Sequence, residues 1–379
     1  MATATQTGTT VLGKIPATMR AAVYHGKDDV RLETVPVPAI GRGELLIRVH
    51  TCGICGTDLK KISTGSHSAP RIFGHETSGM IVAVGEGVTN YSLGERVMVF
   101  HHIPCRDCFY CNRKVFAQCP VYKKVGVTAG YEPSGGGFAE YVRVMDWIVQ
   151  RGGVVRIPQH VSYEQAAFIE PINTCQKGIE TLRLEAGETV LVIGQGPIGM
   201  MLAKLAQAAG ACIFASDMYA QRLAVSRSFG ITNVIDASKE DATQRIREAT
   251  DGRGADAVIV AVAGNALVQV TLDATRPGGR VLLFAQTTRS QATIDPSAVC
   301  MDEKFLLGSY SASVDLQKES ERFVFSGDMD MTHLVTHRFP LEQAVEAIKL
   351  AMHPQPDSLK IVITPGMSWE GKQSNGGGS

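Results

Sequence analysis

The stretch TVLVIGQGPIGMMLAKLAQAAGACIFASD, residues 189–217, decides the fold predicted for this chain. It opens with an apolar run at 190–193, which is short enough for a buried parallel strand. Gly194, Gly196 and Gly199 follow at once and fit the pattern G-x-G-x-x-G. The glycines therefore stand where a strand ends and another element begins.

A helix is predicted directly after these glycines. Four apolar residues recur at i, i+3, i+4 and i+7 and form one helical face: Ile198, Met201, Leu202 and Leu205. Gly210 is a natural end for this helix, because glycine takes the left-handed conformation without strain. A second apolar run at 212–215 then leads to Asp217, so the order is strand, helix, strand and acid.

This order predicts a dinucleotide-binding unit. The first glycine allows a tight turn, the second lets backbone approach a pyrophosphate, and the third lets helix and strand pack closely. Phosphates would lie at the helix N-terminus, with cofactor contacts from Gly194, Gly196, Pro197, Ile198 and Gly199. Asp217, about 20 residues on, can accept a hydrogen bond from a free ribose 2′-hydroxyl, which favours NAD. The alternative, a chance glycine-rich turn in a chain with 39 glycines, does not explain the flanking strands and acid.

Length and composition limit the class of protein. The 379 residues suggest two domains. Lysine plus arginine and aspartate plus glutamate both number 37, so no basic surface for nucleic acid is expected. No apolar run approaches the ~20 residues of a membrane span. We expect flexible tails at 1–18 and 368–379.

The chain has nine cysteines and no apolar signal sequence at its N-terminus, which favours a reducing, cytoplasmic location and metal thiolates. Four of them lie in one polar loop: Cys105, Cys108, Cys111 and Cys119. Four thiolates this close can close a tetrahedral zinc site with a structural role. The alternatives are separate buried thiols, which a polar loop does not favour, and an iron–sulfur cluster, for which nothing else indicates electron transfer.

A second set of candidate ligands is spread along the chain. GICGTD, GHE and IEP contribute Cys55, Thr57, Asp58, His75, Glu76 and Glu170, and Cys175 follows nearby. A cysteine, a histidine and a carboxylate give zinc three protein ligands and leave a position open for substrate, as in catalytic sites. Taken singly, Cys55, His75 and Glu170 are better explained as a packed thiol, a core histidine and a helix-end acid.

The motifs together resemble those of the zinc-dependent alcohol dehydrogenases of the medium-chain dehydrogenase/reductase superfamily. GICGTD, GHE, the four-cysteine loop and the glycine stretch occur in that family's order, and the similarity runs from about residue 19 to 365. IEP at 169–171 is similar to the polyol and threonine dehydrogenase branch. The resemblance implies that Cys55, His75 and either Glu76 or Glu170 hold the catalytic zinc, with the other glutamate close by. Cys175 is the competing thiolate.

The resemblance also implies roles for residues around the zinc and the cofactor. Thr57 relays the substrate proton, Asp58 orients a ligand, and Arg222 lies along the adenosine side of the cofactor. Lys60 stands where the family often has a histidine at the outer end of the proton relay. The segment 306–313 lacks the arginine with which sorbitol dehydrogenases contact substrate.

After Asp217 the pattern continues to alternate. Helices are predicted at 219–229, 239–250 and 266–275, and strands at 233–236, 257–262, 280–285 and near Phe305. Such alternation predicts right-handed crossovers and a doubly wound parallel sheet. We therefore expect an α/β protein with a Rossmann domain at 170–313. A β-rich, GroES-like catalytic domain would comprise 19–169 and 314–367, including a helix at 341–352 and a strand at 360–364.

The sequence thus predicts an NAD-dependent dehydrogenase of secondary alcohols with one catalytic and one structural zinc. By resemblance, its substrate is a polyol or a related small hydroxylated molecule, and the chain forms a homo-oligomer, a tetramer or a dimer. An L-threonine 3-dehydrogenase is the alternative within enzymes. A zinc-stabilised structural protein without turnover is the alternative outside them, but such a protein needs only the four-cysteine loop.

Overall fold

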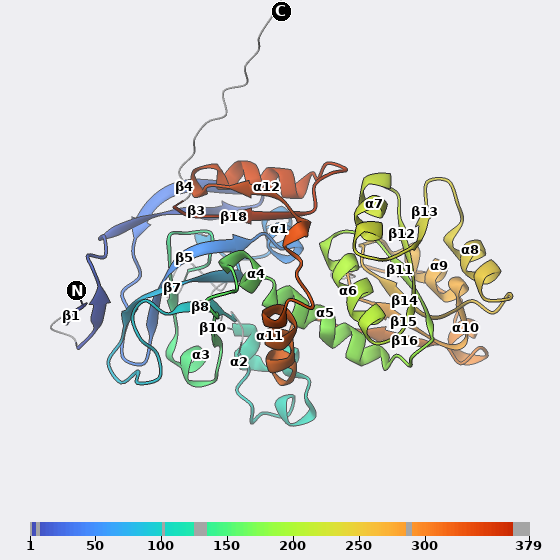
Figure 1. Ribbon diagram of the computed structural model, residues 1–379, viewed down its shortest axis with the longest axis horizontal. Coiled ribbons are helices and arrows are strands. Elements are labelled where there is room, and N and C mark those ends of the chain that lie inside the picture. Colours follow the sequence, from blue (N-terminus) through green and yellow to red (C-terminus); the bar gives the residue numbers. More distant parts are fainter. Residues whose placement is uncertain (1, 5–7, 101–102, 125–134, 286–289, 367–379) are drawn as a thin grey trace, which may run out of the picture.

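The computed structural model describes residues 2–4, 8–100, 103–124, 135–285 and 290–366. Its strands form a nine-stranded, a three-stranded and a six-stranded sheet. Figure 1 shows the six-stranded sheet on one side of the molecule and the β-rich part on the other, with α5 (Ile169–Leu182) between them. No helix in the described ranges is both long and apolar enough to cross a lipid bilayer.

The nine-stranded sheet joins both ends of the described chain. Its main order is β1-β2-β7-β5-β18-β17, and β8, β9 and β10 pair beside it. The strands are β1 (Ala2–Ala4), β2 (Thr10–Leu12), β5 (Leu45–Gly53), β7 (Glu76–Val84), β8 (Arg96–Val99), β9 (Tyr141–Val144), β10 (Val154–Arg156), β17 (Val335–Phe339) and β18 (Lys360–Ile363). Because β18 pairs antiparallel with β5, the C-terminal strand predicted at 360–364 returns to the first part of the chain.

The predicted flexible leader at 1–18 is wrong where β2 lies. Strand β2 pairs antiparallel with β7, and Val11 packs against a small cluster that includes Leu46 and Val82. A three-residue strand is too short to show a period of two in the sequence, so its apolar contacts on the sheet decide its structure. The tail predicted at 368–379 lies outside the described residues.

A small sheet and short helices complete the β-rich part. The small sheet has the order β4-β3-β6, with strands β3 (Thr18–Gly26), β4 (Asp29–Pro36) and β6 (Arg71–Ile72). The helices are α1 (Gly56–Thr64), α2 (Pro120–Lys124), α3 (Asp146–Gln150), α4 (Tyr163–Ala167) and α12 (Ala344–Met352). Helix α12 packs on β18 and beside α1, so it covers the end of the sheet that carries the GICGTD motif.

The six-stranded sheet is parallel throughout and has the order β13-β12-β11-β14-β15-β16. Its strands are β11 (Thr189–Ile193), β12 (Cys212–Asp217), β13 (Asn233–Asp236), β14 (Ala255–Val260), β15 (Thr275–Leu283) and β16 (Phe305–Gly308). In chain order this is 3-2-1-4-5-6, the Rossmann arrangement in which the strand order reverses beside the first strand. The predicted doubly wound sheet is confirmed.

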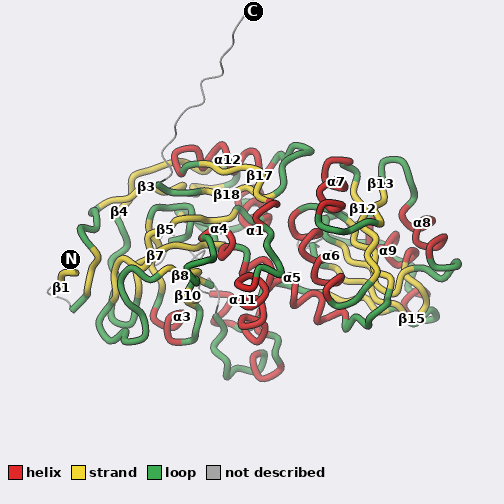
Figure 2. The backbone as a smooth tube through the Cα atoms, in the orientation of Figure 1, coloured by secondary structure: helices red, strands yellow, loops and turns green. Residues whose placement is uncertain are grey.

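Helices cover both faces of this sheet (Figure 2). They are α6 (Pro197–Ala208), α7 (Ala220–Ser228), α8 (Ala242–Ala249), α9 (Leu267–Ala274) and α10 (Ser297–Cys300), and α11 (Gln317–Ser326) packs on α5. Alternate residues of β11 enter different cores, because side chains of a strand point to opposite faces. Val190 and Val192 join the core shared with α5 and α6, whereas Leu191 packs with Ile246 of α8.

Helix ends differ from the predicted ends where a local contact decides them. Helix α8 begins three residues later than predicted, because the Asp241 side chain accepts hydrogen bonds from the N–H groups of Thr243 and Gln244 and caps the helix there. The helix predicted at 341–352 begins with a 3₁₀ turn, Leu341–Gln343, before α12.

Candidate active site

The four-cysteine loop gathers its thiols into one cluster. The sulfur atoms of Cys105 and Cys111 lie 3.8 Å apart, those of Cys108 and Cys111 3.5 Å, and those of Cys119 and Cys105 3.6 Å. A tetrahedron of ~2.3 Å zinc–sulfur bonds has edges of about 3.8 Å, so this loop fits a zinc ion closely. Burial raises the pKa of the Cys119 thiol, but the backbone N–H groups around it lower this pKa to about 7, which favours the thiolate.

A second cluster forms where α1 and β7 begin. Cys55 precedes the first residue of α1, and His75 and Glu76 lie at the start of β7. One ligand atom from each of these three residues lies within 4.8 Å of the other two. A thiol, an imidazole and a carboxylate are a typical donor set for a zinc ion that keeps one position open. The residues present therefore fit a catalytic zinc.

Asp58 orients the histidine of this cluster. His75 Nδ1 lies 3.1 Å from Asp58 Oδ1, and both side chains are buried. Burial alone would lower the pKa of His75, but the charges of Asp58 and Cys55 raise it well above its usual value. The bond to Asp58 fixes the orientation of the ring, as in metal sites where a carboxylate orients a ligating histidine.

Glu170 and Cys175 lie near this cluster on α5 but are not among its closest members. Glu170 is 5% exposed, and burial raises its pKa to about 7, while the charge of His75 lowers it and that of Glu76 raises it. Cys175 Sγ points to the carbonyl of Ile198 at 3.9 Å, and burial raises its pKa well above the usual value. The compact group is therefore formed with Glu76, and Cys175 is a packed thiol.

Thr57 lies in the first turn of α1, two residues after Cys55, and its side chain is exposed. Thr57 is thus close in the chain to one member of the cluster and open to solvent. That is the position expected of a group that passes a proton between a buried site and water.

The glycine turn of 194–199 forms a cradle for phosphate. Gly194 has φ +95°, which only glycine adopts easily, and a side chain there would meet Val262 Cγ1 at 2.3 Å. A side chain on Gly199 would lie 1.7 Å from the Gly194 carbonyl oxygen, so this glycine permits the contact between helix and strand. Gly196 has no atom within 4 Å of the place of a side chain, and α6 begins at the next residue, Pro197. The open space at a helix N-terminus fits a pyrophosphate.

Asp217 ends β12 beside this turn. Its carboxylate accepts hydrogen bonds from the backbone N–H groups of Gln195, at 2.6 Å, and Tyr219, at 2.9 Å. Arg222 Nη1 lies 3.9 Å from Asp217 Oδ2. The acid and the arginine therefore form one charge pair at the position expected for the ribose.

Comparisons with known proteins agree with this geometry. Residues 41–159 match the family model of the alcohol dehydrogenase GroES-like domain, and residues 197–325 match that of zinc-binding dehydrogenases. Sorbitol dehydrogenase of Bacillus subtilis strain 168 is 31% identical over 357 residues, which are 93% of this chain and 98% of that protein. The chain belongs to the zinc-type alcohol dehydrogenases of the medium-chain family.

Two solved structures agree with this family. The 2R,3R-butanediol dehydrogenase of Bacillus subtilis has a TM-score of 0.80 at 28% identity and covers 92% of this chain and 99% of its own. A protein assigned as a zinc-binding dehydrogenase from Sinorhizobium meliloti 1021, with NADP bound, has a TM-score of 0.83 at 26% identity, covering 92% and 100%. The expected family and its GroES-like and Rossmann parts are confirmed, and zinc and a nicotinamide dinucleotide are its cofactors.

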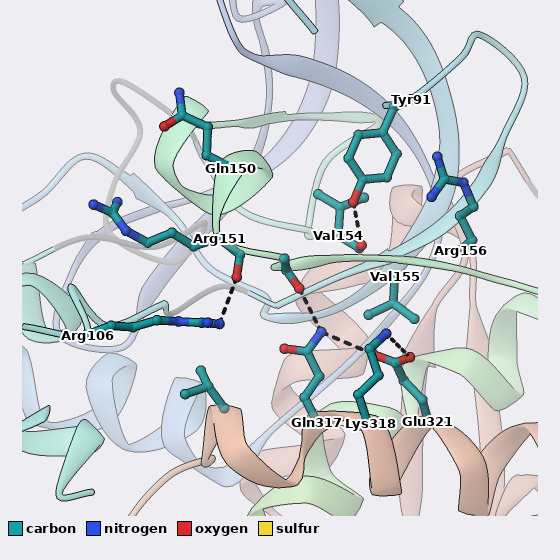
Figure 3. A pocket seen from close by; sticks show the side chains of 12 residues that line it. Tyr91, Arg106, Gln150, Arg151, Val154, Val155, Arg156, Gln317, Lys318 and Glu321 are labelled. Atoms are coloured by element: carbon teal, nitrogen blue, oxygen red, sulfur yellow. Dashed lines mark hydrogen bonds and ion pairs between the residues drawn. The ribbon is translucent and has the colours of Figure 1, made fainter. Parts of the chain in front are cut away.

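A separate cavity of about 690 Å³ lies between the α3–β10 turn and α11 in this dehydrogenase (Figure 3). Gln317 donates to the Gly152 carbonyl at 2.7 Å, and Arg106 of the four-cysteine loop donates to the Arg151 carbonyl at 3.0 Å. None of the three residues of the Cys55 cluster lines the cavity. The two hydrogen bonds around the cavity join the α3–β10 turn to α11 and to the four-cysteine loop, so they link these three segments.

Sequence reasoning missed Lys360, the first residue of β18. Its ammonium group forms an ion pair with Glu76 and donates to the Ile54 carbonyl at 3.1 Å. In the sequence it is a single lysine before an apolar run, a common pattern at a strand end. No signal in the chain marks it, because its partners lie about 300 residues away and meet it only through strand pairing.

The four-cysteine cluster yields a first prediction. Replacing Cys108 by serine should remove about one zinc per chain and lower the melting temperature, because metal binding at such sites is part of the folding free energy. Zinc content by atomic emission and a thermal melt measure both effects. Cys212→Ser, which removes an exposed thiol outside both clusters, is the control and should change neither. Unchanged zinc in folded Cys108→Ser protein would refute the assignment.

Proposed function

We propose that this enzyme catalyses the NAD-dependent oxidation of a secondary hydroxyl of a polyol, or of a related small hydroxylated molecule, and the reverse reduction. The observation that carries the proposal is the group of Cys55, His75 and Glu76, whose ligand atoms lie within 4.8 Å of one another. The similarity to a sorbitol dehydrogenase and a butanediol dehydrogenase supports substrates with neighbouring hydroxyls. Segment 306–313 has no arginine, so sorbitol itself is not the favoured polyol.

Each side chain has a separate task in this reaction. A zinc ion held by the cluster would supply Lewis-acid polarisation of the substrate oxygen, and NAD held at the glycine turn would supply the hydride acceptor. Cys55 and Glu76 supply negative charge that holds the cation, and Asp58 fixes the His75 ring. Thr57 takes the hydroxyl proton and passes it toward solvent. Oxidation of the alcohol would thus transfer one hydride to the cofactor and release one proton, which Thr57 would carry.

We further propose two zinc ions per chain. The closed set of four thiols leaves no position for substrate, whereas the Cys55 cluster does, so the two sites have different roles. Glu170 lies close enough to the Cys55 cluster for the charges of His75 and Glu76 to act on its carboxyl, and it serves as the neighbouring carboxylate that holds water.

A substrate panel and six variants test the function. Reduction of NAD⁺ is followed with polyols, 2,3-butanediol, sugar phosphates, L-threonine and simple alcohols. Cys55→Ala should lose the catalytic metal and all activity but keep the structural zinc. Thr57→Ala should keep both metals while kcat falls by about 10²-fold or more, because proton transfer is lost.

Thr57→Ser is the matched control, since it keeps the hydroxyl. Cys175→Ala removes a nearby buried thiol and should change neither the zinc content nor kcat. If Cys175→Ala loses metal while Glu76→Gln and Glu170→Gln retain it, the polyol-type site is replaced by a simple-alcohol site. L-Threonine as the best substrate would favour the threonine dehydrogenase function instead.

Cofactor preference is a third prediction. Asp217 repels a 2′-phosphate and pairs with Arg222, which leaves that guanidinium engaged and favours NAD over NADP. Asp217→Ser should release Arg222 and reduce the ratio of kcat/KM for NAD⁺ to that for NADP⁺ by about tenfold or more. Asp217→Ser should raise kcat/KM for NADP⁺, and the double variant Asp217→Ser/Arg222→Gln should lose this increase. Equal kcat/KM for both cofactors in the unmodified enzyme would contradict this preference.

We also propose a homo-oligomer, because the outer strand of the parallel sheet is open. In the described chain β16 pairs with β15 alone, and Phe305 and Leu306 on it are 56% and 37% exposed. Met301 beside it is 81% exposed. An open edge with apolar side chains is an aggregation hazard unless another chain covers it.

Light scattering after gel filtration tests this interface. Phe305→Lys should lower the oligomeric mass, because a charge then faces the covered edge. Val270→Lys, which places the same charge at an exposed apolar site on α9, should leave the mass unchanged. A monomeric unmodified protein would contradict the proposal.

A further inference from the structure

Lys360 lies deep within the catalytic part of the molecule. It is 6% exposed, and its ion-pair partner Glu76 is 1% exposed. Strand β18 brings it there by pairing with the end of β5, where Val362 lies opposite Gly53. The same strand accepts the N–H of Ile54 through the Ile361 carbonyl, at 3.0 Å. The C-terminal strand therefore borders the residue that precedes Cys55.

Gly53 provides the space for this ion pair. It lies opposite Glu76 in the pairing of β5 with β7. A side chain on Gly53 would begin 2.0 Å from Glu76 Oε2 and 2.9 Å from Lys360 Cε. The carboxylate thus rests against bare backbone on one side and is bound by the ammonium group on another. Few other rotamers are open to the Glu76 side chain in such a packed place.

We propose that Lys360 is the positioning residue that fixes Glu76 as a ligand of the catalytic metal. By binding the carboxylate it holds Glu76 in the rotamer that places one ligand atom within 4.8 Å of those of Cys55 and His75. This inference rests on the proposed metal role of the Cys55 cluster. It assigns Glu76 as the third ligand, because the ion pair with Lys360 holds its carboxylate in the group formed with Cys55 and His75.

The charge of Lys360 and its hold on Glu76 have opposite effects on metal binding, so an experiment can tell them apart. The ammonium group repels a nearby cation, so if Lys360 acted by charge alone, its removal would tighten metal binding. If it acts by holding Glu76, its removal should weaken metal binding and change the coordination geometry. Groups that orient metal ligands typically contribute 10–100-fold to metal affinity.

The experiment uses the full-length enzyme with cobalt(II) at the catalytic site and zinc in the four-cysteine loop. Lys360→Met removes the ammonium group and keeps the length of the side chain. We expect a changed visible cobalt spectrum and about tenfold or faster metal release to a chelator. Lys360→Arg should largely restore the cobalt spectrum and the slow metal release of the unmodified enzyme. Neither measurement needs a substrate, so an error in the proposed substrate does not affect the result.

A double-variant cycle identifies the partner. Adding Lys360→Met to Glu76→Gln should have no further effect on the spectrum or the release rate, because Lys360 acts through Glu76. Lys304→Met, a change at another buried lysine that binds Asp302 and the Leu272 carbonyl, is the matched control and should leave the cobalt spectrum unchanged.

If Lys360→Met does not fold, Gly53→Ala provides a second route. It displaces the Glu76 carboxylate while Lys360 remains, and should cause the same spectral change. An unaltered spectrum with unaltered or slower metal release in either variant overturns the inference, as does an additive double variant. Retention of the catalytic metal in Cys55→Ala would instead refute the proposed metal site itself.

Discussion

Buried ionisable groups at one point of the β-rich part constrain the rest of this structure. Asp58, His75, Glu76 and Lys360 are all less than a tenth exposed, although each is commonly charged in water. Taking such groups out of water costs several kcal/mol each unless they are paired or bind a metal. The structure pairs Asp58 with His75 and Glu76 with Lys360. The two pairs can form only where α1, β7 and β18 meet.

This requirement explains why the last described strand belongs to the first part of the fold. Strand β18 inserts between β5 and β17, and α12 packs on it beside α1. Lys360 on β18 thus reaches Glu76 on β7 across β5, which lies between these two strands, so the early and late segments of the chain meet at the Cys55 cluster. Helix α5 closes the remaining side with Glu170 in its first turn, and it packs on α6 of the parallel sheet. One helix therefore contacts both β7, which begins at Glu76, and α6, which follows the glycine turn.

The cofactor site depends on steric limits more than on charge. Gly194 and Gly199 each lie where a side chain would overlap a neighbouring atom, whereas the space beside Gly196 is open. The same turn is fixed from the other strand, because the Gln195 N–H donates to Asp217. The acid therefore fixes the glycine turn and also stands at the position expected for the ribose. Because Asp217 acts on the turn and stands at the expected ribose position, one short stretch of sequence specifies both parts of the site.

The sequence by itself determined the features that depend on near neighbours. The glycine stretch predicted its strand, helix and second strand, and the four-cysteine loop predicted its cluster, because fewer than 30 residues separate the members of each set. Apolar alternation predicted the doubly wound sheet. Only the tertiary structure decided that β2 joins the large sheet, that Glu76 forms a group with Cys55 and His75 within 4.8 Å, and that Lys360 binds Glu76. These contacts arise from strand pairing and side-chain packing between distant segments, and no local pattern of residue types records which strands pair.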